Sequence, residues 1–486
     1  MASPYAVDSK APYGSIGWKF VGDQAVHLDA NKEENSTTRL RWLSKPIQVL
    51  LIAILLSIFV IEMYWGDFHA ALMKVSQPLQ GVTDLVELQK QRVQYEGCSP
   101  IAASLSRHFG FNVSQHDSPA GEWHFIDSTR AESRGRVRGE VNLRRGHPLQ
   151  DSDIEVRVIV NSTEEGGLQN FILNTTESTL SLDYLPSGGK DLCTDIQVMI
   201  YLRPEVEFRQ NSLELRSEIL HMWVHGSLAW KIDNLILHTS YGDSTFEGTR
   251  LPEPLITHNI SVSSVAGTIF GWYPADGNLD IRNDKNMIGF FLVARYDRPF
   301  SPESISISSK SGTIDIRSIF EYWGSRPMAH TTNIHSESGN IWLGIPHGSI
   351  TNVSSQSGNI AAYLKPWGAS SPDDISEFYT STQIGNTRIY LTDMDLDTPK
   401  KYFNPLLNTT SKHTARTGRM EICYPYSWYG EAEARIDSGS LMFDSSSLEE
   451  IERGDGWVKA RRGNKGESRL EAYVESGEME VLLGLC

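Results

Sequence analysis

Alternating aspartates at Asp393, Asp395 and Asp397 are the residues in this chain best suited to metal chemistry. Carboxylate oxygens are hard ligands, and a D-x-D pair can hold Mg²⁺ or Mn²⁺ on the diphosphate of a nucleotide. The same spacing fails as an EF-hand loop, because Thr398 and Asn404 occupy the positions that require Gly and Glu. The chain has 60 acidic residues, so D-x-D is also common by chance. An acidic loop explains the pattern better, and we predict no metal ligand and no cofactor.

Two enzyme classes stay open as alternatives. Type II Golgi glycosyltransferases use a D-x-D pair, which here would be Asp393 and Asp395. They need an α/β nucleotide-binding domain, yet the sequence around this pair shows no alternation of strand and helix patterns. A polysaccharide-acting β-helix enzyme would instead need carboxylates and basic residues that converge on one face of the fold.

Nucleophile motifs are almost absent. The chain has no G-x-S-x-G, H-E-x-x-H or P-loop pattern. Its S-x-x-K spacing, Ser187 to Lys190, follows a proline and encloses two glycines, which is typical of a hairpin turn. The 14 histidines are scattered, and for the closest notable pair, His330 and His335, we expect surface or structural roles. We therefore predict no catalytic residue and no enzyme.

Asn-x-Ser/Thr sequons are the most frequent modification motif. N-glycosylation occurs on surface loops outside the cytosol, so occupied sequons would report on topology. A sequon at Asn35 lies on the side that we predict to be cytosolic and should stay unmodified. The sequons that we predict to be modified are Asn112, Asn161, Asn174, Asn259, Asn352 and Asn408.

The four cysteines are Cys98, Cys193, Cys423 and Cys486. None forms a C-x-x-C pair or has a histidine at zinc-ligand spacing, so a metal site is not predicted. In an oxidising compartment they are candidates for disulfides, and the sequence does not choose among the pairings.

One apolar segment defines how these residues are presented. Residues 46–66 are long enough to cross a bilayer as a helix. Arg39, Arg41 and Lys45 flank their N-terminal side, and basic flanks stay in the cytosol. We predict a signal anchor, a disordered cytosolic tail over residues 1–45, and a single-pass type II protein of the plasma membrane or secretory pathway.

Residues 67–95 carry apolar side chains at three- to four-residue spacing. This pattern predicts a short helical stalk, or equally a helix packed on the main domain. The net charge of the chain is −16, which disfavours nucleic acid as a partner. The predicted partners are the membrane, which is spanned once, and cell-wall or surface glycans or proteins.

Residues 96–486 have an all-β texture of short alternating segments, such as Glu155–Val160 and Ile196–Tyr201. From residue 226 onward a motif recurs, S-x-S-G-x-I followed by alternate apolar residues. Its clear copies centre on Gly312, Gly339 and Gly358. Weaker copies centre on Gly267, Gly439 and Gly477, and only the second half of the motif recurs after Gly226 and Gly277.

The physical meaning of this motif is a corner followed by a short strand. Ser-Gly is typical of a tight corner, where we expect glycine to adopt a conformation that a residue with Cβ resists. After Gly312, Ile314 and Ile316 should face one side and Asp315 the solvent. Such a strand buries its apolar side only by stacking on its neighbours, which predicts a β-solenoid or parallel β-helix. The alternative is a sandwich whose hairpins use Ser-Gly turns.

At these residues the chain resembles adhesin-type β-solenoid domains, and membrane-anchored fungal glycoproteins carry similar repeats. The resemblance implies a solenoid fold and a binding or structural role, and it supplies no catalytic residues. Aromatic residues are frequent in the same half, and exposed rings could stack on sugars, whereas buried ones would plug the coil. They are Trp272, Tyr273, Tyr322, Trp323, Trp342, Trp367, Trp428 and Tyr429.

Overall fold

The computed structural model describes residue 98 and residues 101–485, except 114–120, 134–135, 187–191, 205–208, 227, 229, 248–255, 275, 294–300, 319–328, 367–375, 393–405, 407 and 464–467. The predicted tail, signal anchor and stalk lie outside the described residues. Within those residues, no helix is both long and apolar enough to cross a membrane. The all-β prediction is confirmed. In the described part, 28 strands share one hydrogen-bonded sheet, and the helical content is one 3-10 turn, η2 (Ala131–Ser133).

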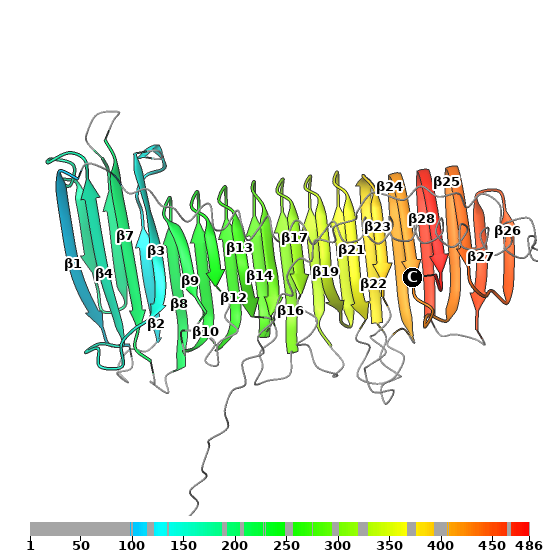
Figure 1. The fold of residues 1–486 in the computed structure, drawn as a ribbon, viewed down its shortest axis with the longest axis horizontal. Helices are drawn as coiled ribbons and strands as arrows, with labels where there is room; N and C mark the ends of the chain where they lie inside the picture. The colour runs from blue at the N-terminus through cyan, green and yellow to red at the C-terminus, as the bar shows by residue number, and fades with distance from the viewer. Residues whose placement is uncertain are drawn as a thin grey trace, which may run out of the picture. The chain divides into compact units, whose positions relative to one another are not determined.

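Between residues 209 and 391, every second strand pairs in parallel, so that the chain builds two ladders (Figure 1). The even ladder contains β8 (Arg209–Ser217), β10 (Lys231–Thr239), β12 (Ile256–Ser264), β14 (Asp276–Asn283), β16 (Ser301–Ser309), β18 (Thr331–Ser336), β20 (Ile350–Ser355) and β22 (Ser376–Ile384). The odd ladder contains β9 (His221–His225), β11 (Ser244–Glu247), β13 (Ile269–Pro274), β15 (Ile288–Val293), β17 (Ile314–Ser318), β19 (Ile341–His347), β21 (Ile360–Pro366) and β23 (Thr387–Leu391). Each coil therefore gives one strand to each ladder, as stacked coils require.

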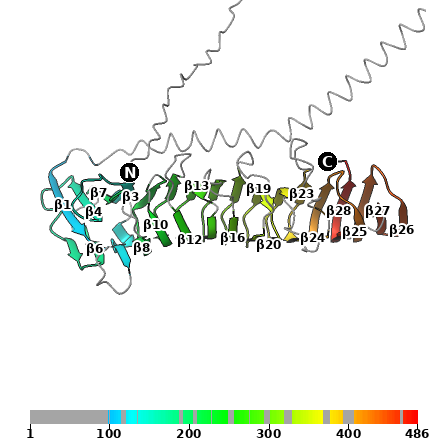
Figure 2. The same ribbon diagram turned by 90° about the horizontal axis from the view of Figure 1, so that it is seen from below.

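The core lies between the two ladders, which form two layers in Figure 2, with β13, β19 and β23 on one side and β12, β16 and β20 on the other. Ile314 and Ile316 of β17 are fully buried, and Asp315 between them lies outside the core. On the facing ladder, Ile307 of β16 is 1% exposed. The alternation predicted after each Ser-Gly corner is thus observed, and both strands of a coil contribute to one continuous apolar core.

The serines of the motif have separate tasks. The hydroxyl of Ser309 accepts a hydrogen bond of 2.8 Å from the backbone N–H of Gly312, inside its own corner. The hydroxyl of Ser338, the serine before Gly339, donates to the carbonyl of Lys310 on the preceding coil at 3.0 Å. One serine therefore closes the corner, and the other binds each coil to its neighbour.

Motif glycines form a column in which backbones of successive coils approach closely. A Cβ on Gly339 would lie 1.9 Å from the carbonyl oxygen of Gly312, and one on Gly358 would lie 2.1 Å from that of Gly339. The predicted reason, a left-handed conformation, is wrong for these three glycines, since their φ angles are not positive. It holds for Gly439, whose φ is 130°. Gly277 lies at the start of β14 instead, paired with a residue of β16, and does not belong to the column.

The N-terminal part of the described chain departs from parallel stacking. It contains β1 (Ala103–Phe111), β2 (Glu122–Asp127), β3 (Val137–Arg145), β4 (Ile154–Ser162), β5 (Phe171–Thr175), β6 (Thr179–Tyr184) and β7 (Thr194–Leu202). Strands β1, β4 and β7 pair antiparallel, while β3 joins β7 to β9 in parallel. A disulfide joins Cys98 to Cys193 just before β7. The predicted strands at 155–160 and 196–201 are observed here, within β4 and β7.

At the C-terminal end, long strands run along both ladders. Their order in the sheet differs from their order in the sequence. These elements are β24 (Thr409–Tyr424), β25 (Gly430–Ser445), β26 (Glu450–Gly454), β27 (Trp457–Arg462) and β28 (Ser468–Leu483). The last strand, β28, lies between β24 and β25 and pairs in parallel with both (Figure 1). Beyond β25, the strands β27 and β26 continue antiparallel. Cys423 in β24 is disulfide-bonded, and Cys486 lies outside the described residues.

Candidate functional site: an aromatic face on the odd ladder

Outward-facing positions of the odd ladder are rich in aromatic side chains, and we call this surface the aromatic face. Trp342 is 43% exposed, and the other rings are partly buried. Trp272 and Phe291 stack across adjacent coils with centroids 4.8 Å apart, and Tyr363 and Tyr390 stack at 5.2 Å with an interplanar angle of 3°. The aromatic face consists of Trp223, Phe270, Trp272, Phe291, Trp342, Tyr363 and Tyr390.

Charged groups on the aromatic face are paired. Arg317 contacts both carboxylate oxygens of Asp315 at 2.9 Å. Glu421 accepts from Arg388 at 3.1 Å and from the hydroxyl of Tyr390. Burial and the hydrogen bond to this carboxylate raise the pKa of Tyr390, so that its phenol stays protonated. Because these charges neutralise one another, the rings lie among polar groups that carry little net charge.

The row of aromatic side chains is interrupted at Gly344, where the missing side chain leaves a small depression. In the pairing register, this residue lies between Arg317 of β17 and Tyr363 of β21. A Cβ placed on Gly344 would meet its nearest atom only at 4.0 Å, so the space beside Trp342 is open. The combination of an exposed indole and an adjacent depression is the part of this face most accessible to a ligand.

The outer surface of the even ladder, which we call the polar face, has a different chemistry. Side-chain amides stack there along the coils: Asn259 donates to Asn234 at 2.8 Å, and Asn278 donates to Asn259 at 2.9 Å. Further along, Asn352 donates to Asn333 at 2.8 Å. Two of these residues, Asn259 and Asn352, are the asparagines of predicted sequons. The ladder explains the regular placement of amides on this face, because each side chain bonds to the coil before it.

None of the six sequon asparagines is fully buried, and none lies on the odd ladder from β9 to β23. Asn174 on β5 and Asn112 after β1 are exposed. Asn161 accepts a hydrogen bond from the Ser104 hydroxyl through its carbonyl oxygen at 2.8 Å, which leaves the amide nitrogen for a glycan. Asn408 precedes β24 with a φ of 58°. Glycans at the predicted positions would thus leave the aromatic face uncovered.

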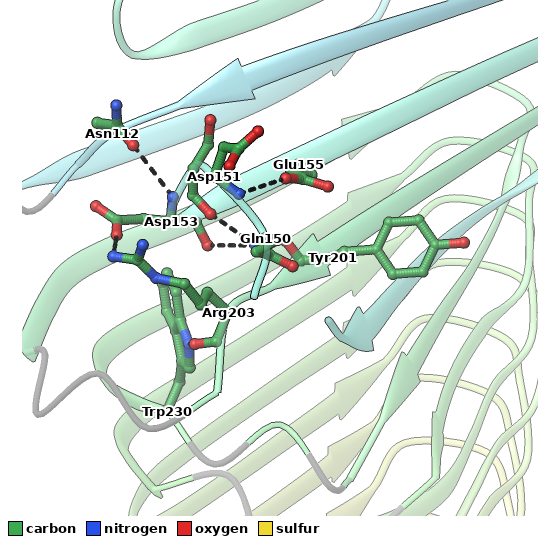
Figure 3. Close-up of polar contacts among 9 residues, drawn as sticks. Asn112, Gln150, Asp151, Asp153, Glu155, Tyr201, Arg203 and Trp230 are labelled. Carbon is green, nitrogen blue, oxygen red and sulfur yellow. Dashed lines mark hydrogen bonds and ion pairs between the residues drawn. The ribbon is translucent and has the colours of Figure 1, made fainter. Parts of the chain in front are cut away.

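A polar cluster holds Asn112 at the N-terminal part (Figure 3). The carbonyl oxygen of its side chain accepts from the backbone N–H of Asp153 at 3.3 Å. Asp153 is buried and forms an ion pair with Arg203, whose own carbonyl accepts from the indole N–H of Trp230 at 2.8 Å. Gln150 donates to the carbonyls of Asp153 and Tyr201. Since its charges and carbonyls bond internally, this cluster connects β4, β7 and the first coil rather than forming an acid–base site.

Three histidines are buried in the core. Burial lowers the pKa of His330 to about 4, and that of His347 and of His413 to about 3. The structural role expected for His330 is therefore observed. His335 of the same predicted pair faces outward on β18, where its ring nitrogen lies 2.9 Å from the hydroxyl of Ser354.

Both roles predicted for the aromatic residues occur. Tyr273 and Trp428 are buried and fill the core, whereas Trp342 and Tyr429 are exposed. Tyr322, Trp323 and Trp367 lie outside the described residues. The same holds for Asp393 and Asp395, and for Ser187 and Lys190. Within the described chain, no group of acidic, histidine or cysteine side chains has a metal-binding arrangement.

Near the C-terminus, two shallow hollows of about 270 and 560 Å³ lie beside β25, β26 and β27. Their linings mix acidic and basic side chains, and Lys459 lies 3.5 Å from Glu433 across the two strands. No single sign of charge dominates, so these hollows indicate no particular ligand.

No family model matches the chain, and no curated protein matches it. Among solved structures, a candidate adhesin from Bacteroides fragilis is 9% identical, with 78% of this chain and 100% of that chain covered and a TM-score of 0.26. A candidate adhesin from Parabacteroides distasonis is 10% identical, with 66% and 97% covered and a TM-score of 0.30. A candidate lipid-binding protein from the same species is 9% identical, with 79% and 97% covered and a TM-score of 0.18. At such TM-scores and identities the likeness carries no argument about function.

Proposed function

We propose that this chain is a single-pass type II membrane glycoprotein whose β-solenoid binds polysaccharide chains through its aromatic face, in the manner of an adhesin. We also propose that the chain is related to the membrane-anchored fungal glycoproteins whose repeats it resembles. The observation that carries it is the division between the two outer faces. Aromatic rings gather on the odd ladder, and Asn259 and Asn352, as sequon asparagines, lie on the even ladder.

The chemistry of the aromatic face favours sugars over other ligands. Ring faces such as that of Trp342 pack well against the C–H groups of a pyranose, while neighbouring polar groups bond its hydroxyls. Strands of adjacent coils lie about 4.8 Å apart, a spacing close to that of sugars along an extended polysaccharide, and the rings are distributed along this direction over several coils. A chain lying along the coil axis could therefore contact several rings at once, and multiple weak contacts add in affinity.

Polysaccharide binding should depend on Trp342. Replacing Trp342 and Trp272 with alanine removes two rings and should weaken binding at least about tenfold. The full chain in detergent would be screened against cell-wall polysaccharides and a glycan array, and its affinity for each hit measured. Ser308→Ala, on the polar face, is the matched control and should bind normally. A protein that binds no polysaccharide, or binds equally well without the two indoles, contradicts the proposal.

The pattern of N-glycosylation at the sequons should reveal the orientation of the chain in the membrane. In a eukaryotic secretory host we expect the full chain to carry glycans that peptide N-glycosidase removes, with one gel-mobility step lost in each of Asn259→Gln and Asn352→Gln. Asn35→Gln should change nothing, because its sequon lies before the anchor. A glycan on Asn35 and none after residue 66 would mean the opposite orientation.

A further inference from the structure

Strand β25 has one edge that is only half paired. On one side it pairs with β28 from Gly430 to Ser445. On the other side β27 pairs with Gly430–Arg435 alone, and the N–H of Ile436 donates to the carbonyl of Gly456 at 2.8 Å. Within the described chain, no strand pairs with Ser438–Ser445 on that side. We call this segment the open edge. The carbonyl of Phe443 accepts from the side chain of Arg453 at 3.3 Å and the N–H of Ser445 donates to Asp444 at 2.7 Å, so the outward backbone groups before Phe443 are the template for another strand.

The open edge has few of the features that usually protect a terminal strand, and those lie at its end, where Asp444 is charged and Arg453 covers the carbonyl of Phe443. At the opposite end of the sheet, β1 carries the exposed charged or polar side chains of Arg107 and His108 on its outer strand. In the open edge, residues 438–443 contain no charge and no proline, and Met442 is 54% exposed. The uncharged stretch before Asp444 would promote pairing with another chain. Its chemistry is therefore that of a contact surface.

The facing ladder extends past the open edge. Strands β27 and β26 continue the layer formed by the first half of β25, while the layer formed by its second half ends. Ile451 of β26 pairs with Ala460, which pairs with the buried Ala432, so all three lie on the core side. Ile451 is nevertheless 43% exposed. The side chain of Ile451 is exposed because the opposite layer has no strand facing β26.

We propose that this step at the end of the coils accepts an extended segment of a partner protein, which adds as a parallel strand to the open edge. The proposal is independent of polysaccharide binding. The pairing of β28 with β25 defines the fitting sequence, because Gly477, Met479 and Val481 lie opposite Gly439, Leu441 and Phe443. The partner segment needs a small residue followed by two apolar residues at alternate positions.

A second copy of this chain is the less suitable occupant. Two open edges related by a two-fold axis would pair antiparallel. Strands β27 and β26 of both copies would then extend toward each other over the same space, because each reaches two strands past its own edge. A single extended segment avoids this overlap.

The test uses the full chain in detergent and a fluorescent peptide with the sequence of residues 475–483, which already forms a parallel strand on β25. A control peptide carries aspartate in place of Met479 and Val481. We expect saturable binding of the first peptide only. Leu441→Lys, at an inward position of the open edge, should weaken binding at least about tenfold. Met442→Lys, which faces outward, should stay within about twofold.

Equal binding of both peptides, or equal loss in both lysine variants, would overturn the proposal. A measurement that needs no variant is amide hydrogen exchange. Addition of the peptide should slow exchange in residues 438–445 and leave β1 unchanged. Unchanged exchange in the open edge, or protection that grows with protein concentration without peptide, would also overturn it, the latter in favour of self-association.

Discussion

Replacing Gly339 with alanine should destabilise the protein by about 3 kcal/mol, because the added methyl group collides with a rigid backbone. Its Cβ would lie 1.9 Å from the carbonyl oxygen of Gly312 on the preceding coil. No rotamer relieves this contact, so the coils must move apart and weaken the hydrogen bonds between them. Chemical denaturation of the full chain in detergent measures the loss.

Gly344→Ala is the matched control for that variant. Gly344 lies on the next strand after the same corner, and its added Cβ meets nothing closer than 4.0 Å. Its stability should change by less than about 0.5 kcal/mol. A Gly339→Ala protein as stable as the control would show that close stacking at the glycine column does not hold the coils together.

Acid should destabilise the protein between pH 6.5 and 4, owing to the buried histidines. Burial holds the pKa of His330 at about 4 and those of His347 and His413 at about 3. Their unfolded pKa is about 6.5, so below that pH the unfolded chain binds protons that the native state refuses. Each histidine lowers stability by about 2 kcal/mol at pH 5 relative to pH 7.5, or about 6 kcal/mol together.

One buried carboxyl opposes this trend. Burial raises the pKa of Asp127, so its protonated form is favoured in the native state and its contribution grows as the pH falls. The net acid effect still follows the three imidazoles. Denaturation at pH 7.5 and pH 5 measures it, and His347→Gln should reduce the difference by about 2 kcal/mol. His335→Gln changes an outward-facing ring and should leave the difference unaltered. An unchanged pH dependence in His347→Gln would contradict this explanation.

The sequence predicts the repeating part of the fold well because the signal is local. The corners at Gly312 and Gly339 use a serine that bonds three residues ahead and a glycine that a neighbouring coil touches, so both types recur at fixed spacing. Ser309 and Gly312 show this relation through one hydrogen bond of 2.8 Å. The alternation of Ile314, Asp315 and Ile316 likewise specifies which side chains enter the core.

Features that depend on register between distant segments are not predictable in the same way. The asparagine ladder needs Asn234 and Asn259, 25 residues apart, to lie on adjacent coils, which irregular loop lengths conceal. Trp272 and Tyr273 are adjacent in the sequence, yet Trp272 stacks on the outer surface and Tyr273 is buried in the core. The aromatic face becomes visible only when the coils are aligned. The antiparallel pairing of β4 with β7 is concealed for the same reason.

The interleaving of β24, β28 and β25 has a consequence for biosynthesis. β28 is synthesised after both of its neighbours, β24 and β25, yet it occupies an interior position and bonds along both sides. The earlier coils can stack in the order of synthesis, but β25 waits for a neighbour that does not yet exist. The pairing of β24 and β25 with β28 therefore forms only after all three strands have been synthesised, and a premature stop codon before residue 468 would remove an internal strand of the sheet.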